Sequence, residues 1–404
     1  MIGCFWQGVQ HVKLSGRLSV LLCPLTNIIP LVGTLCPGLI LIDADANVRW
    51  LLFFFAQIGA AQVAFINPPS LKLDFTDAAN IADCALIEKA VRKVILSIIN
   101  SMAVLPNRFL VKLDPAADYF KVYQPYQGIL RLTVEKATGV TGSKKSSGIR
   151  RFMDSIAKDV PDCYAKVTLG AESEWRTSSE KNSHEPTWNE TSDVLVSDYD
   201  QTITVDVQDE DVVGDDDMGI ASITVKQLLL AGGSQELKLT HDGQITTGSV
   251  TIHAKFYKFV PDAASFSSDD NIHQGTRLFC GLATVLVASV LGLSGQRDEL
   301  RPSVKVSWGT TKFRTAAKAY APGVDIFNPS FDTAFRIPIT RDMVNQPEDF
   351  VITLMNGDAE SGCVVIPFAD VLRMPGMVLE DSFDVGSGVS VRASISLRGM
   401  QLAE

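Results

Sequence analysis

The stretch YAKVTLG, residues 164 to 170, decides the fold class, because apolar and polar side chains alternate along it and a glycine ends it. A similar pattern returns as SVKVSWG at residues 303 to 309. The segment EPTWNETSDVLV from Glu185 is likewise matched by NPSFDTAFRIPI from Asn328. Both offsets, about 140 residues, have the size of one β-sandwich domain. The sequence therefore predicts a mainly β fold with two related antiparallel β-sandwiches.

The composition is that of a folded protein with more than one domain. The chain has 404 residues, of which 46% are hydrophobic and 20% are charged. Because 36 basic residues stand against 46 acidic ones, binding of nucleic acid by the whole molecule is not expected. The cysteines form no CxxC pair, the histidines have no metal spacing, and the chain has neither a GxSxG nor a P-loop motif. The sequence thus indicates no enzyme and no zinc site.

The chain is expected to fall into four segments. These are an apolar block at 1–114 with an atypical insertion at 34–59, a first sandwich at 127–259, a linker at 260–277 and a second sandwich at 278–402. A helix-like run covers residues 85–114. The apolar stretch 278–293 is too short to span a membrane, which takes about 20 residues, so we expect it to be a buried strand.

The most acidic string in the first sandwich is VQDEDVVGDDDMG, residues 207–219. Seven acidic residues and no basic one occur from Asp206 to Asp217, and they would repel one another unless a cation lay among them. The alternative is a solvated acidic loop. Together with PDCYAKVTLG (161–170) and PTWNE (186–190), this string resembles the C2 domain family, the calcium-dependent phospholipid-binding sandwich.

The resemblance implies a Ca²⁺ site in the first sandwich. Three of the acids have the D-x-D-x5-D spacing of the family's third calcium loop, and the residue before position 163 stands where its first loop supplies an aspartate. The family's second first-loop aspartate is missing, because that loop is stretched over residues 141–160. Asp154 or Asp159 could replace it, or the site is one ligand short and weaker. The expected metal ligands are Asp162, Asp209, Asp211, Asp217 and Asp154.

The stretched loop predicts a short basic amphipathic helix. Its apolar residues recur at i, i+3, i+4, i+7, i+8 and i+11, with basic residues beside them. Such a helix lies in a membrane interface, where each basic group contributes about 1 kcal/mol near an anionic leaflet. The alternative is that it packs on its own domain. The expected membrane-binding residues are Lys144, Lys145, Ile149, Arg150, Arg151, Phe152, Met153 and Ile156.

The second sandwich looks like a divergent C2 domain. Arg301 and Pro302 occupy the first-loop position, while Asn356 and Asp358 remain in the third loop without a spaced third acid, so good calcium binding is not expected. Its basic residues form either an inositol-lipid patch on adjacent strands or a scattered surface set. They are Lys305, Lys312, Arg314 and Lys318.

The N-terminal block resembles the C-terminal half of an SMP domain, the tubular lipid-binding module. The resemblance is carried by residues 9–25, residues 60–83 and VLPNR at 104–108. In such a module an apolar helix face takes up the acyl chains of a glycerolipid, whereas the alternative is an ordinary core helix. The expected groove residues are Val91, Ile95, Ile98, Ile99 and Met102.

The order of an SMP-like fragment and two C2 domains is similar to extended synaptotagmins and tricalbins. It implies calcium-regulated binding to anionic phospholipid membranes and tethering on their cytosolic face. It also implies glycerolipid transfer at contacts between endoplasmic reticulum and plasma membrane, and homo- or hetero-oligomers through the SMP-like part. The family's membrane anchor and the first half of its SMP domain are not expected in this chain. The alternative function is a membrane adaptor that uses only its C2 domains.

Overall fold

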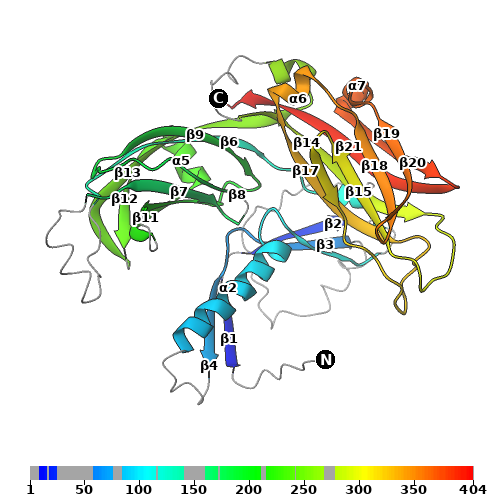
Figure 1. The fold of residues 1–404 in the computed structure, drawn as a ribbon, viewed down its shortest axis with the longest axis horizontal. Coiled ribbons are helices and arrows are strands. Elements are labelled where there is room, and N and C mark those ends of the chain that lie inside the picture. The colour runs from blue at the N-terminus through cyan, green and yellow to red at the C-terminus, as the bar shows by residue number, and fades with distance from the viewer. Residues whose placement is uncertain are drawn as a thin grey trace. The chain divides into compact units, whose positions relative to one another are not determined.

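The computed structural model describes residues 9–15, 18–24, 58–75, 84–114, 117–140, 160–171, 173–210, 215–241, 243–267 and 278–403. These residues divide into two compact units, Met1–Ala117 with Leu130–Lys255 and Asp118–Ile129 with Phe256–Glu404. Antiparallel strands dominate both units, and helices are few (Figure 1). All but the end of the expected insertion at 34–59 lies outside the described residues.

The first sandwich has eight strands among the described residues. They are β6 (Gly128–Thr138), β7 (Cys163–Leu169), β8 (Ser173–Arg176), β9 (Thr187–Val196), β10 (Thr202–Asp209), β11 (Asp216–Thr224), β12 (Ser234–His241) and β13 (Gln244–Val260). One layer has the order β8-β7-β10-β11 and the other β9-β6-β13-β12. The core between the layers follows from the alternation, since Ile203, Val205 and Val207 of β10 are fully buried while Thr204 and Asp206 between them are not.

Alternating side chains predict seven strands in this sandwich, and each overlaps a strand of the structure; the predicted ranges are 128–135, 163–169, 190–196, 202–208, 219–225, 235–240 and 248–257. The sequence did not foresee β8 or the helix α5 (Val225–Leu230), because both are too short to show a period. A capping box at Thr224 starts α5: its hydroxyl accepts the Gln227 N–H, and the Gln227 side chain accepts the Thr224 N–H.

The second sandwich repeats the strand order of the first. Its strands are β14 (Phe279–Leu291), β15 (Pro302–Trp308), β16 (Thr311–Arg314), β17 (Ser330–Thr340), β18 (Phe350–Asn356), β19 (Ala359–Ile366), β20 (Val378–Gly386) and β21 (Val389–Leu402). The layers are β16-β15-β18-β19 and β17-β14-β21-β20, with α6 (Arg341–Asn345) and α7 (Phe368–Arg373) in the connections. The internal repeat is therefore confirmed.

Strand β14 confirms the expectation for the apolar stretch 278–293. It lies between β17 and β21 and is buried over most of its length, because a central strand facing a packed layer needs apolar side chains. Opposite it, the ring of Trp308 stacks on Phe350 at 4.6 Å and on Phe368 at 5.6 Å between centroids.

The segment Asp118–Ile129 belongs to the same unit as the second sandwich. It contains the short helix α3 (Tyr119–Val122), whose N-cap is Asp118. The Asp118 carboxylate lies 3.2 Å from the Arg392 guanidinium, which also stands 4.9 Å from the ring centre of Phe120. Residues 118–122, which precede the first predicted sandwich, are thus packed structure.

The N-terminal block forms small sheets and one long helix. Strands β1 (Val9–Ser15) and β4 (Ser70–Phe75) form one sheet, and β2 (Leu18–Pro24), β3 (Ile58–Phe65) and β5 (Phe109–Lys112) form another. The helix α2 covers Cys84–Ala103. The expectation of a helix-like run over 85–114 is therefore wrong at its C-terminal end. Pro106 cannot continue a helix, and the residues after it pair with β3 instead.

Candidate functional site

Three connections of the first sandwich lie at the same end of it. They join β6 to β7, β8 to β9, and β10 to β11. Asp162 precedes β7 and Asp209 ends β10, and these strands are neighbours in the sheet. The alternation that buries the valines of β10 thus continues to a carboxylate at the strand end, where the core gives way to solvent.

The structure brings Asp162 and Asp209 together. The Asp162 N–H donates to Asp209 Oδ1 at 2.7 Å, and the Asn182 N–H donates to Asp162 Oδ1 at 2.8 Å. The neighbouring thiol experiences the negative charge of both carboxylates. Burial raises the pKa of Cys163 to about 12, with Asp209 and Asp162 acting in the same direction. Two adjacent carboxylates are the kind of donor set that a hard cation takes.

The third loop places its other acids on two faces of the sheet. Asp209 is opposite Asp216 in the β10–β11 register, whereas Gln208 is opposite Asp217, so Asp216 shares the face of Asp209. A bulge after Val207 sets this register, and Gly219 beside it has a φ of 130°, which favours glycine. The spacing of the acids singles out Asp217 and does not point to Asp216, because a bulge leaves no mark in that spacing; Asp217 as a metal ligand stays a prediction.

Asp217 instead contacts His241 at the end of β12. The Asp217 Oδ2 to His241 Nδ1 distance is 3.2 Å, and the Gly219 N–H donates to Asp217 Oδ1 at 2.8 Å. On the same face, burial and then the charge of Asp217 raise the pKa of Asp206 to about 6. A side-chain hydrogen bond from Gln208 at 2.8 Å acts in the opposite direction. The acidic loop therefore carries an excess of negative charge on this face as well.

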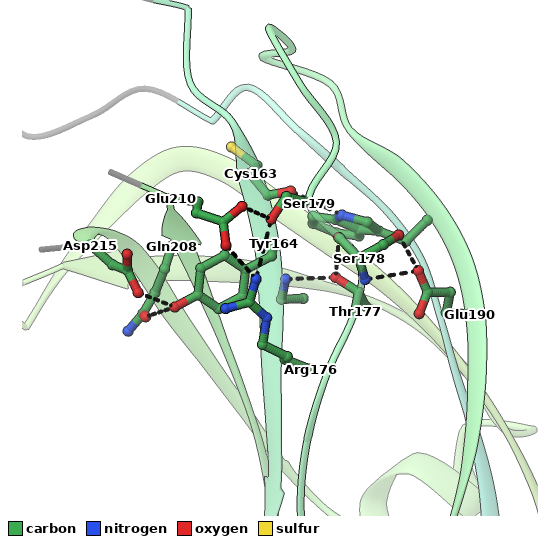
Figure 2. Close-up of polar contacts among 12 residues, drawn as sticks. Cys163, Tyr164, Arg176, Thr177, Ser178, Ser179, Glu190, Gln208, Glu210 and Asp215 are labelled. Carbon is green, nitrogen blue, oxygen red and sulfur yellow. Dashed lines mark hydrogen bonds and ion pairs between the residues drawn. The ribbon is translucent and has the colours of Figure 1, made fainter. Parts of the chain in front are cut away.

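Figure 2 shows how the stems of the third loop are held. Arg176 of β8 donates to Glu210 at 2.6 Å, and its guanidinium stands 4.0 Å from the ring centre of Tyr164. Ser179 also donates to Glu210, at 2.5 Å. At the other stem, the Tyr164 hydroxyl lies 2.6 Å from Asp215 Oδ2. These contacts hold both ends of the loop that carries the acids, and no pattern in the sequence indicated them.

The other predicted residues of this site lie outside the described residues. These are Asp154, Asp211 and the eight membrane-binding residues of the stretched first loop. Within the described part of the chain, no group of three His, Cys, Asp or Glu side chains is arranged to hold a metal ion. The five-residue ligand set and the amphipathic helix therefore stay predictions.

The predicted basic patch of the second sandwich is only partly on strands. Lys305 is on β15 and Arg314 on β16, but Lys318 follows β16 in a loop. Lys305 Nζ lies 2.7 Å from Glu360, and Arg314 Nη1 lies 3.6 Å from Asp358. Carboxylates therefore partly neutralise the strand-borne cations.

The predicted groove residues lie on α2 with unequal exposure. Val91, Ile95 and Ile99 are half-buried, whereas Ile98 and Met102 are each 53% exposed. An ordinary core helix would bury this row. Val94 on the same helix and Phe109 on β5 are also more than half exposed, so the block presents apolar surface on two of its elements.

Comparison with known families identifies the class. The C2 domain family model matches residues 128–240 and 282–382, which lie in the two sandwiches and cover more than half of the chain. The chain belongs to the C2 domain family.

Individual relatives show which members of the C2 domain family this chain resembles. The chain is 26% identical over 392 residues to extended synaptotagmin-1 of Pongo abelii, covering 94% of this chain and 32% of the relative. It is 22% identical over 415 residues to human extended synaptotagmin-2, covering 98% of this chain and 40% of the relative. The chain thus spans well under half the length of these relatives, and its resemblance to the extended synaptotagmins is confirmed.

Solved structures support the same architecture. A structure of extended synaptotagmin 2 with its SMP domain and two C2 domains matches 98% of this chain and 78% of its own length, with a TM-score of 0.61 and 20% identity. A calcium-bound structure of the same two C2 domains matches 70% of this chain and 100% of its own length, with a TM-score of 0.56 and 18% identity. The expected fold, an SMP-like α+β fragment before two C2 sandwiches, is confirmed. None of the described helices is long and apolar enough to cross a membrane.

Proposed function

We propose that this protein tethers membranes through calcium-regulated docking of its first C2 domain on anionic phospholipid, and that its N-terminal block carries glycerolipid between them. The observation that carries the docking proposal is the contact at the loop end of a C2 sandwich where the Asp162 N–H donates to Asp209 Oδ1, so that two acidic residues lie side by side. Bound Ca²⁺ would neutralise these acids and offer coordination positions to lipid phosphate.

The described residues fit part of a site for a hard cation. Asp162 and Asp209 supply carboxylate oxygens, and Asp216 shares the face of Asp209 in the sheet. Arg176 and Tyr164 hold the loop stems, which keeps these oxygens in place before any ligand arrives. The solved relative that is described as calcium bound supports the choice of cation.

The lipid-carrying part of the proposal rests on the exposed apolar row of α2. Ile98 and Met102 are half exposed although both are good core residues, and burying an apolar side chain of this size contributes about 1.5 to 3 kcal/mol. An acyl chain would supply that burial. The contact site between endoplasmic reticulum and plasma membrane, and oligomers through this block, follow from the family likeness.

Cosedimentation of the full chain with phosphatidylserine vesicles, with and without Ca²⁺, tests the docking. Binding that Ca²⁺ strengthens, by an increment that Asp209→Asn removes, supports the docking, and binding that neither Ca²⁺ nor the substitution changes contradicts it. Native mass spectrometry of the purified protein tests the cargo. Co-purified phospholipid supports transfer, whereas calcium-dependent docking without any bound lipid favours the adaptor that uses only its C2 domains.

A further inference from the structure

The two sandwiches share one hydrogen-bonded frame at their loop ends. In the first, the Asp162 N–H donates to Asp209 Oδ1 at 2.7 Å. In the second, the Arg301 N–H donates to Asn356 Oδ1 at 2.6 Å. Arg301 therefore occupies the position of Asp162, and Asn356 that of Asp209.

Two further pairs of positions match by their backbone hydrogen bonds. The carbonyl before β7 accepts from the Glu210 N–H at 3.0 Å, and the carbonyl before β15 accepts from the Gly357 N–H at 2.9 Å. The carbonyl of the first residue of β7 accepts from the Glu180 N–H at 2.8 Å, and that of β15 from the Lys318 N–H at 2.9 Å. Gly357 thus replaces Glu210, and Lys318 replaces Glu180.

The second sandwich therefore reverses the charge of this frame. Four carboxylates of the first domain are matched by an arginine, a lysine, an amide and a glycine. Carbonyl oxygens hold the new cation in place, since Arg301 Nη1 donates to the backbone of Asp298 at 2.9 Å and of Leu300 at 2.8 Å. Because carbonyls orient a guanidinium without cancelling its charge, the frame now attracts anions.

Exposed apolar side chains follow Lys318 along the same loop. Tyr320 and Val324, in the loop that follows β16, are 44% and 42% exposed. The guanidinium of Arg297 lies 5.5 Å from the ring centre of Phe327 and 6.0 Å from that of Tyr320. Cations next to an exposed phenol ring and a branched aliphatic side chain suit the headgroup layer of a bilayer, where each kind of group finds its own environment. An acidic protein partner without apolar surface would contact the cations but would leave Tyr320 and Val324 exposed to water.

We propose that the loop end of the second C2 domain docks on an anionic phospholipid bilayer without calcium. It is a site separate from the calcium site of the first domain, and it does not depend on that site. Arg301 and Lys318 contact lipid phosphates, and Tyr320 and Val324 enter the interface. The protein would then remain on an anionic membrane at resting calcium through its second domain, and the first domain would add calcium-dependent binding.

Flotation of the full chain with phosphatidylcholine vesicles, with and without phosphatidylserine and always in EGTA, tests this proposal. Wild type should bind only the phosphatidylserine vesicles. The Arg301→Gln/Lys318→Gln variant should bind them about 30-fold more weakly, because each cation near an anionic surface contributes on the order of 1 kcal/mol. The matched control Lys226→Gln/Lys238→Gln removes two exposed cations from the first domain and should bind within about twofold of wild type.

A variant that is expected to strengthen vesicle binding excludes misfolding as the cause of weaker binding in the first variant. Asp298→Asn/Glu299→Gln removes exposed acids next to Arg301 and should strengthen binding in EGTA. Equal losses in the test and control variants, unchanged binding in both charge variants, or equal binding to vesicles without phosphatidylserine would each overturn the proposal. Adding Ca²⁺ to the Arg301→Gln/Lys318→Gln variant tests the first domain separately, so failure of one site is not mistaken for failure of the other.

Discussion

Asp209→Asn is the substitution that tests the calcium site most directly, because this protein already contains its structural outcome. At the matched position of the second sandwich, Asn356 Oδ1 accepts the Arg301 N–H at 2.6 Å. In the first sandwich Asp209 Oδ1 accepts the Asp162 N–H at 2.7 Å, and an asparagine oxygen can accept the same bond. The variant should therefore fold and lose only one negative charge.

The size of the effect follows from Coulomb's law. A carboxylate oxygen contacts Ca²⁺ at about 2.4 Å, and one unit charge at that distance from a divalent ion is worth about 3 kcal/mol even with the dielectric constant of water. Loss of that charge, with the amide oxygen still present, should weaken calcium binding roughly 100-fold. Without Ca²⁺ the variant should unfold at a higher temperature than wild type, because it removes one of the seven acidic residues from Asp206 to Asp217, which repel one another.

Isothermal titration of Ca²⁺ into the full chain measures the first effect and differential scanning calorimetry in EGTA the second. Asp381→Asn, the same chemical change at an exposed strand position of the second sandwich, is the matched control and should change neither. Wild-type calcium affinity in Asp209→Asn, with the fold intact, would refute the assignment of this carboxylate as a ligand. A melting temperature that falls would show that the pair of carboxylates is stabilising by some other route.

Three other predictions concern stability and lipid loading. Asp193→Ala should lower the free energy of unfolding by about 3–5 kcal/mol in urea titrations, because it leaves Arg131 buried without the carboxylate that accepts its bonds at 2.8 and 2.9 Å. The pKa of Asp206 is about 6 against 3.8 in its ordinary state, so the folded protein binds this proton more tightly and loses stability as pH rises from about 4 to 6. Asp206→Asn should remove that pH dependence and raise the free energy of unfolding by about 1 kcal/mol at pH 7, a value reduced for solvent screening because the side chain is half exposed. Denaturant titrations from pH 4 to pH 7 measure both effects. Ile98→Ser/Met102→Ser should lower the free energy of unfolding by only about 2 kcal/mol, because each side chain is already half exposed, and it should also lower the phospholipid retained in native mass spectrometry; unchanged retention would place the lipid elsewhere.

The long strands were predictable because their pattern is local. Alternating apolar and polar side chains over about seven residues predict a half-buried strand, and the same pattern occurs twice, from residue 164 and from residue 303. The same local logic fails at Pro106, where an apolar run passes from helix α2 into strand β5 without a change in hydrophobicity. Only pairing with β3 distinguishes the two states.

The acids of the candidate site were predictable only as a set. Their number and their family spacing are properties of the sequence, but a side chain's face is decided by register, and one bulge after Val207 exchanges the faces of two successive residues. For that reason the sequence could not show that Asp216 shares the face of Asp209, or that Asp217 lies beside His241. A bulge depends on the strand opposite, so no local pattern reports it.

From local patterns alone, the sequence predicts a mainly β protein with two sandwiches of one family, of which only the first retains an acidic third loop. It could do so because strand formation and charge count are read from neighbours along the chain. Two relations are visible only in the folded chain. Asp162 lies against Asp209, and Lys318 of the second sandwich takes the position that Glu180 has in the first. Those relations join residues separated along the chain through sheet register and loop closure, which no local alternation records.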